Sequence, residues 1–179
     1  MREQNSNGKF RILKFQNFQK IPKTELRNLR ALILIVDSGV NEDEIKLDEL
    51  ENSIPIILVL KGKADKNLVE KCHICLATEN AKIGNLSSSE ALKKKLINRI
   101  VAETSIETEA IEMAERISEK TAPLAVKALL KAVIEGEKLE LEEGLRLEAE
   151  LFSQLFSTED AREGTKAFLE KRSPNFQGK

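Results

Sequence analysis

The stretch from Glu143 to Lys179, EGLRLEAELFSQLFSTEDAREGTKAFLEKRSPNFQGK, carries the most specific pattern in this chain. It predicts two helices and a tail, and the first helix, over residues 139–156, is apolar on two sides. One apolar line consists of Leu141, Leu145, Phe152 and Phe156, and the other consists of Leu147 and Leu151. Because apolar area of this size is costly to leave in water, we expect this helix to be central in the fold or at a subunit interface. The candidate interface residues are Leu147, Leu151, Phe152 and Phe156.

Helix-start signals mark the other helices of the second half of the chain. Ser87 with Glu90 fits a capping box, and Thr104 with Glu107 repeats the pattern. The helix that follows Thr104 has an apolar face made of Ile106, Ala110, Met113, Ala114 and Ile117.

The next helix begins at Pro123, a residue that a first helical turn tolerates, and Gly136 ends it. The last helix is opened by Ser157 and Asp160, carries Phe168 and ends before Pro174.

Apolar runs in the first half of the chain predict strands. Residues 31–37 (ALILIVD) and 54–60 (IPIILVL) are continuous apolar runs, which is typical of strands covered on both faces. Residues 71–77 and 81–84 predict a third and a short fourth strand. The near-alternation over residues 10–17 predicts a half-buried or edge strand.

A short surface helix is expected over residues 41–51, and residues 24–30 offer at most a short helix. Since the strands precede the main helices, the sequence predicts an α/β domain followed by a helical C-terminal part. We expect one continuous domain, with an α/β core over residues 1–103 and a helical region over residues 104–179.

Composition excludes several classes of function. The chain has 179 residues, 41% of them hydrophobic, which suffices for one core. Its 29 Lys and Arg residues nearly balance 30 Asp and Glu residues, so we expect no nucleic-acid or membrane partner. The apolar runs fall short of the roughly 20 residues of a membrane span, and MREQNSNGK lacks the apolar segment of a signal peptide. We therefore expect a soluble, cytoplasmic protein, and its two cysteines fit a reducing compartment.

The segment FSTEDAREGTKAFLEKRSPNF, residues 156–176, closely resembles the C-terminus of the crotonase superfamily, the enoyl-CoA hydratase/isomerase family. Residues 72–84 (CHICLATENAKIG) resemble the family's CDIxxAxExAxFG strand. Residues 30–39 and 52–64 resemble the strands that lead to its two oxyanion loops. The resemblance implies a truncated crotonase-like (ClpP/crotonase) fold, with a small β-sheet core followed by C-terminal helices that build a trimer or a dimer of trimers.

The family's oxyanion loops have no counterpart in this sequence. The family holds the thioester oxygen with two backbone N–H groups, one in an AGxD-like loop and one in a GGG run. Here DSGV runs directly into an acidic segment, and KGKA (residues 61–64) is followed by DKNLVEKC. The remaining candidates for backbone donors are Gly39 and Gly62.

The family's two catalytic carboxylates are also missing at their matched positions. Counting back from Cys72 without a gap places Asn67 at the first position, and Ser87 falls at the second. If the deletion is placed differently, Glu70 becomes the candidate base, although it would lack its oxyanion partner.

Two C-terminal residues match positions that contact coenzyme A in a neighbouring subunit. Phe168 matches the phenylalanine near the adenine, and Lys171 matches the lysine near a phosphate. We favour the alternative that Phe168 is an interface or core anchor and Lys171 a solvated charge. The ligand that the resemblance implies is a coenzyme A thioester, and no cofactor is expected.

Cys72, His73 and Cys75 do not predict a metal site. Cys72 and Cys75 point to opposite faces of a strand, and tetrahedral zinc takes four ligands, or three and a water. We expect His73 to be a structural histidine.

The resemblance leads to two functional hypotheses. The preferred one is a catalytically impaired homologue, retained for oligomerisation or for assembly with a full-length active relative. The alternative is a hydratase or isomerase of enoyl-CoA thioesters with an altered active site.

Overall fold

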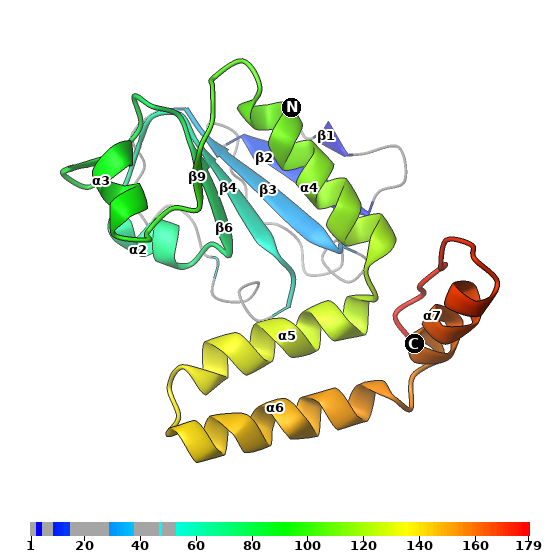
Figure 1. The fold of residues 1–179 in the computed structure, drawn as a ribbon. Helices are drawn as coiled ribbons and strands as arrows, with labels where there is room; N and C mark the ends of the chain where they lie inside the picture. Colours follow the sequence, from blue (N-terminus) through cyan, green and yellow to red (C-terminus); the bar gives the residue numbers. More distant parts are fainter. Residues whose placement is uncertain (1–2, 5–8, 15–28, 38–46, 48–52) are drawn as a thin grey trace.

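The computed structural model describes residues 3–4, 9–14, 29–37, 47 and 53–179 of the chain. The described strands form two sheets (Figure 1). The large sheet has the order β1-β2-β3-β4-β6-β9 and contains β1 (Glu3–Gln4), β2 (Phe10–Lys14), β3 (Ala31–Val36), β4 (Ile56–Leu60), β6 (Ile74–Ala77) and β9 (Arg99–Ile100). From β2 to β9 all neighbours are parallel, and only β1 is antiparallel to β2.

Every residue of β3 and β4 is buried, as their continuous apolar runs predicted. Alternate residues of β3 point to opposite faces, so that Leu32, Leu34 and Val36 join one core cluster while Ile33 and Ile35 join the other. Helices α2 (Lys66–Glu70) and α3 (Ser88–Lys93) contribute buried residues to the first cluster. Helix α4 (Ile106–Lys120) covers the second face (Figure 1).

The prediction of a half-buried or edge strand at residues 10–17 is wrong for the part that the structure describes. β2 lies between β1 and β3, and Phe10 to Leu13 are all buried. Burial of Arg11, at 6% exposure, shows that a charged residue at an alternate position does not guarantee a wet face. The expected helices at residues 24–30 and 41–51 lie largely outside the described residues, although Leu47 is buried in the core.

A second, three-stranded sheet was not predicted as a separate unit. It joins β5 (Lys63–Ala64), β7 (Lys82–Ile83) and β8 (Leu86–Ser87). The fully buried Ser88 fixes the turn that leads into β7, because its Oγ lies 2.7 Å from the Thr78 carbonyl oxygen and 2.9 Å from that of Ala81.

One of the two predicted capping boxes forms. Ser87 and Glu90 bond reciprocally at the start of α3. The box expected from Thr104 and Glu107 is wrong: Ser105 is the N-cap of α4 and makes no side-chain cap bond. Glu107 instead accepts a hydrogen bond from Lys61, a long-range contact that competes with the local cap.

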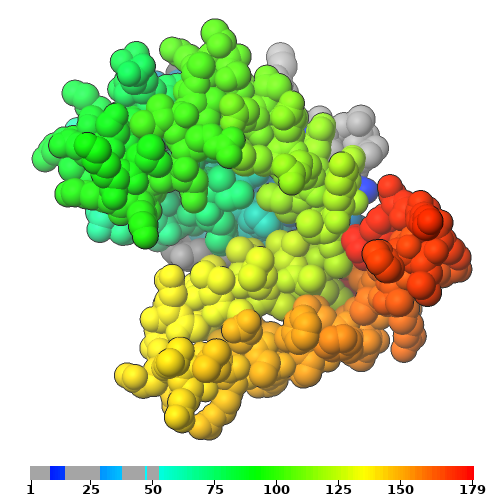
Figure 2. Space-filling model, viewed as in Figure 1, coloured from blue at the N-terminus to red at the C-terminus, as the bar shows by residue number. Residues whose placement is uncertain are grey.

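Helices α5 (Pro123–Gly136) and α6 (Leu141–Leu155) form an antiparallel hairpin beside the α/β body (Figure 1). Pro123 begins α5 as predicted, and Gly144 of α6 approaches the Gly136 carbonyl closely. Neither helix contains a fully buried residue. Figure 2 shows this hairpin as a lobe along one side of the molecule, with the C-terminal segment at its far end.

The last helix, α7 (Glu159–Leu169), begins after Thr158, whose Oγ1 accepts the Ala161 N–H. The prediction that Ser157 opens this helix is wrong, whereas Asp160 lies in its first turn as predicted but does not cap it. Asp160 instead is buried and accepts the backbone N–H groups of Gln177 and Gly178, at 2.7 and 2.9 Å. The division at residues 103 and 104 stays a prediction, although α4 packs on the sheet of the first part.

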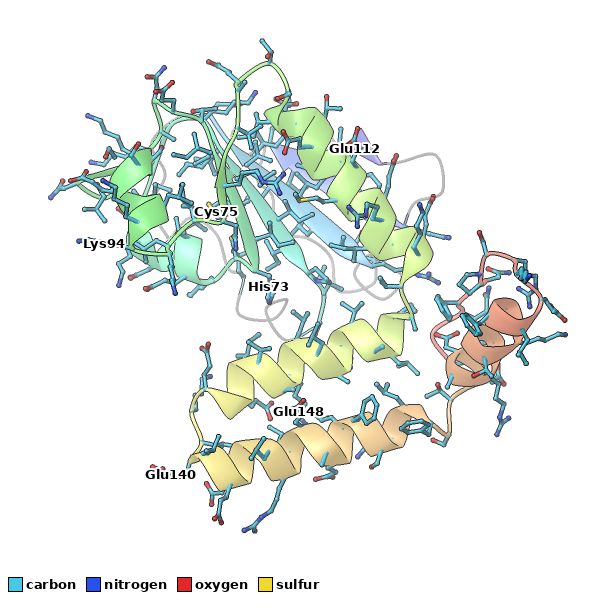
Figure 3. All side chains as sticks on the ribbon, viewed as in Figure 1. His73, Cys75, Lys94, Glu112, Glu140 and Glu148 are labelled. Atoms are coloured by element: carbon cyan, nitrogen blue, oxygen red, sulfur yellow. The ribbon has the colours of Figure 1, made fainter. Side chains whose placement is uncertain are left out.

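His73 ties β4 to the start of β6 (Figure 3), because its Nδ1 accepts the Ile56 N–H at 2.9 Å and its own N–H donates to the Ile56 carbonyl at 3.0 Å. We predict that His73→Phe lowers the free energy of unfolding by about 1–3 kcal/mol, because a partly buried N–H loses its acceptor. Chemical denaturation measures the change. His73→Asp is the matched control, since a carboxylate oxygen can accept the same bond; equal losses in both variants would contradict the role of Nδ1.

Candidate functional site

Three polar residues follow neighbouring parallel strands at the carboxyl edge of the large sheet. Asp37 follows β3, Lys61 follows β4 and Thr78 follows β6. Open parallel sheets place their ligand sites at this edge, so these residues define the first candidate site.

Lys61 is engaged in ion pairs at this edge. Its Nζ donates a hydrogen bond to Glu107 at the start of α4, and it lies 3.8 Å from Asp37 Oδ1. Burial alone would lower the pKa of Lys61, but the hydrogen bond to Glu107 and the charges of Glu107, Asp37 and Glu103 outweigh it and hold the pKa above its usual value. Lys61 is therefore a charged, paired group at neutral pH and not a proton-accepting base.

The backbone donors next to Lys61 are committed to the fold. The Gly62 N–H donates to the Val36 carbonyl at 3.2 Å, and the Lys61 N–H donates to the same oxygen at 2.8 Å. An oxyanion hole needs N–H groups that are aimed at the incoming oxygen. Gly62 does not offer one in this conformation, and Gly39 lies outside the described residues.

Glu70 is the last residue of the five-residue helix α2. Its carboxylate forms an ion pair with Lys66 at 2.8 Å, and both side chains are about half exposed, at 49% and 59%. The Glu70 carboxylate is therefore engaged with Lys66 at the surface of α2.

The two positions that match the family's catalytic carboxylates carry Asn67 and Ser87 instead. Asn67 lies exposed on α2, and the Ser87 hydroxyl is used to cap α3. The described residues therefore bring no pair of acid and base groups together at the carboxyl edge beyond the Lys61 ion pairs.

The cysteines and His73 have structural surroundings. Burial raises the pKa of the Cys75 thiol to about 12, so it is protonated at neutral pH and a poor nucleophile. Within the part of the chain that the structure describes, no three His, Cys, Asp or Glu residues are grouped closely enough to hold a metal ion.

Phe168 and Lys171 lie on open surface at the end of α7. The Phe168 side chain is 82% exposed. Lys171 adopts a left-handed backbone conformation with φ of 54°, in which its N–H donates to the Phe168 carbonyl and ends the helix. Neither residue is a core anchor in the single chain, so both are free for a partner or a ligand.

A shallow groove of about 320 Å³ lies at the C-terminal end of α4, lined by Ile74, Met113, Arg116, Ile117, Lys120 and Thr121. A second, of about 420 Å³, lies between the end of α6 and α7 and is lined by Phe156, Ala161, Arg162, Thr165, Lys166 and Leu169. Both grooves combine apolar walls with two cationic side chains.

Among the helices of the described residues, none has the length and apolar character of a membrane span.

The four candidate interface residues occupy two sides of α6. Leu147 and Leu151 are half-buried, together with Gly144, on the side that packs against α5. Phe152 and Phe156 are 61% and 68% exposed, and their rings meet edge to face with centroids 5.1 Å apart. The exposed apolar line continues through Leu141 and Leu145, which are 76% and 55% exposed.

Arg172 organises the C-terminal tail in a way that the sequence did not predict. Its guanidinium forms two bonds to the Glu163 carboxylate, at 2.6 and 2.9 Å, and a third to Glu170 at 2.6 Å. Glu163 also accepts the Asn175 N–H at 2.8 Å. The only advance signal was the charge pattern of AREG and EKR, which is equally typical of a solvated helix face.

Comparison with solved structures defines the class of fold as that of enoyl-CoA hydratases. The match to the Bacillus anthracis enzyme has a TM-score of 0.77 with 21% identity and covers 96% of each chain. A probable enoyl-CoA hydratase/isomerase from Mycobacterium abscessus gives a TM-score of 0.77 at 22% identity and covers 100% of this chain and 98% of the other. The expected crotonase-like fold is thus confirmed.

The chain belongs to the enoyl-CoA hydratase/isomerase family, whose sequence profile matches residues 67–179. It is 34% identical over 119 residues to enoyl-CoA hydratase EchA19 of Mycobacterium tuberculosis, a match that covers 66% of this chain and 44% of the relative. It is 32% identical over 165 residues to a probable enoyl-CoA hydratase of Bacillus subtilis, with 69% and 63% covered. The matches thus span about half the length of these curated relatives.

The Arg172 network predicts acid sensitivity of the tail. The hydrogen bonds from Arg172, and then from the Asn175 N–H, lower the pKa of Glu163 from 4.5 to about 2. A lowered folded pKa stabilises above the unfolded value, so the contribution is complete above pH 4.5 and is lost as the pH falls towards 2. The protection factors of the amides in residues 172–177, each taken relative to the intrinsic exchange rate at that pH, should fall in that window. Glu163→Gln should exchange faster at neutral pH and lose the acid transition; an unchanged transition would contradict this assignment.

Proposed function

We propose that this chain is a catalytically impaired member of the enoyl-CoA hydratase/isomerase family, retained for association with copies of itself or with a full-length active relative. The observation that carries the proposal is the exposed apolar line of α6, formed by Leu141, Leu145, Phe152 and Phe156. Exposed apolar surfaces of this kind mark protein-protein contacts, because water-exposed area of this size is unfavourable. A trimer, or a dimer of trimers, is the proposed assembly, and the cytoplasm is the proposed location.

The neighbouring helix α5 also carries exposed apolar residues. Leu129 and Val133 of α5 are 62% and 51% exposed, and they add to the apolar area of the hairpin. Since neither α5 nor α6 contains a fully buried residue, the hairpin lacks a closed core of its own. A partner subunit would supply the missing half of that core.

The candidate catalytic groups support impairment. The Gly62 N–H donates to the Val36 carbonyl, Glu70 forms an ion pair with Lys66, and Ser87 caps α3. Loss of one oxyanion donor alone typically costs about 100- to 1000-fold in rate. With the acid and base groups also unavailable, little acceleration remains to be expected.

Acyl-CoA binding is the second candidate function, and one observation favours it. Phe168, in the last turn of α7, is 82% exposed, and Lys171, two residues beyond the end of that helix, is also exposed. In this alternative the chain binds a coenzyme A thioester and acts as a hydratase or isomerase with an altered site.

We predict that Phe152→Asp dissociates the assembly, raising its dissociation constant about 10- to 100-fold, because burial of one large apolar side chain contributes about 1.5–3 kcal/mol. Light scattering coupled to size exclusion measures the change. Ser153→Asp is the matched control: it adds the same charge at the adjacent exposed position on another side of α6. A wild-type monomer, or unchanged assembly of Phe152→Asp, would overturn the proposal.

We also predict that the protein leaves the thioester absorbance of crotonyl-CoA unchanged and that Glu70→Gln has no effect.

Calorimetry with acetyl-CoA separates binding from catalysis. Lys171→Asn removes the charge but tolerates the left-handed conformation, so a heat of binding lost in this variant would establish the coenzyme role. Hydration of crotonyl-CoA by the native protein that is lost in Glu70→Gln would refute the proposal that the chain is catalytically impaired.

A further inference from the structure

Residues 158–179 are bonded chiefly to one another. Asp160, which is 3% exposed, accepts the Gln177 and Gly178 N–H groups, and its own N–H donates to the Lys179 carbonyl at 3.2 Å. The ring of Phe176 lies against Gly164, where a Cβ would come within 3.5 Å of it. We call residues 158–179 the C-terminal unit.

The second half of the tail is held on the same helix by charge. Glu163 of α7 binds Arg172 through both carboxylate oxygens and accepts the Asn175 N–H. Bidentate Arg-carboxylate pairs are the geometrically most specific ion pairs. The C-terminal unit therefore has its own polar frame, independent of the α/β body.

Contacts between the C-terminal unit and the rest of the described chain are few. No other described helix or strand packs extensively against α7. The unit joins α6 through Ser157, and Gly178, with φ of 77°, packs against Pro123 at the start of α5. In Figure 1 the unit stands apart from the sheet, at the end of the hairpin.

Arg30 makes the polar link between the unit and the body. Its Nη1 donates to the Ser118 carbonyl at 3.0 Å, in the last turn of α4, and its Nη2 donates to the Phe176 carbonyl at 2.9 Å. Arg30 itself directly precedes β3, the strand buried at the centre of the fold. One planar guanidinium thus joins the sheet, the C-terminal end of α4 and the tail, a geometry that a lysine ammonium does not reproduce.

We propose that the Arg30 guanidinium is a latch that fixes the C-terminal unit on the α/β body, and that the unit moves as one rigid piece when the latch is broken. The bonds within the unit do not involve Arg30, so the unit stays folded after release. The apolar residues Phe168 and Leu169, which are 82% and 75% exposed, then change their position relative to α6. The latch thereby sets whether these residues and the α6 line can face one partner together.

The test measures the distance between the body and the unit by pulsed electron paramagnetic resonance. Spin labels are placed at Glu112→Cys on α4 and Thr165→Cys on α7, both exposed positions, with Cys72→Ser in the background and Cys75 left buried. Figure 3 shows where Glu112 lies on α4. Dilution with unlabelled protein removes distances between subunits, so the result does not depend on whether the chain associates.

We expect a narrow distance distribution in the otherwise native chain and a broadened, shifted one in Arg30→Met, which keeps the length of the side chain and removes its donors. Hydrogen exchange should show the Gln177 and Gly178 amides still protected, as a rigid unit requires. Arg116→Met, at an exposed arginine near the same end of α4, is the matched control and should leave the distribution unchanged.

An unchanged distribution in a folded Arg30→Met variant would overturn the latch. Loss of protection at Gln177 and Gly178 in that variant would overturn the rigid unit. If Arg30→Met does not fold, Arg30→Lys decides, because a compact ammonium does not reproduce the planar fork that reaches both carbonyl groups: broadening supports the latch, and a native distribution refutes it.

Discussion

The parallel pairing of β3 with β4 is the constraint on which the rest of the structure depends. Both strands are buried on both faces, so every side chain in them must be apolar and each face needs a covering layer. Helices α2 and α3 with the small sheet supply one layer, and α4 supplies the other. The same ladder directs the Gly62 N–H to Val36, so the fold itself decides which backbone donors remain for chemistry.

The sequence predicted the elements whose signal is local and strong. The continuous apolar runs of β3 and β4, the apolar face of α4 and the Ser87 capping box all appear as expected. In the small sheet, β7 lies within the strand predicted at residues 81–84, but β5 and β8 were not predicted, because strands of two residues have no measurable periodicity. Thr104 failed as a cap because Glu107 is drawn to Lys61, 46 residues earlier in the chain, and such a contact leaves no trace in a short window of sequence.

The candidate site also contains residues that the sequence predicted and residues that it did not. Comparison with the family's sequence pattern identifies Glu70, Phe168 and Lys171 as candidate site residues. The structure then shows the surroundings of each one. Glu70 forms its ion pair within one short helix, and Phe168 and Lys171 stand on open surface. The roles of Arg30 and Asp160 depend on carbonyl and N–H groups of the tail, which carry no sequence identity and so could not be predicted from residue patterns.

The α5 and α6 hairpin, which buries no residue completely, has a thermodynamic consequence. In an isolated chain the hairpin contributes little to the cooperative unfolding of the sheet. Its apolar residues stay largely exposed in the folded chain, so folding buries little of their surface. Any partner that covers it binds only the folded form, so mass action links the order of this hairpin to concentration. With such a partner, the midpoint of thermal unfolding depends on concentration as well as on the sequence. Dilution alone then separates the stability of the α/β body from that of the helices beside it.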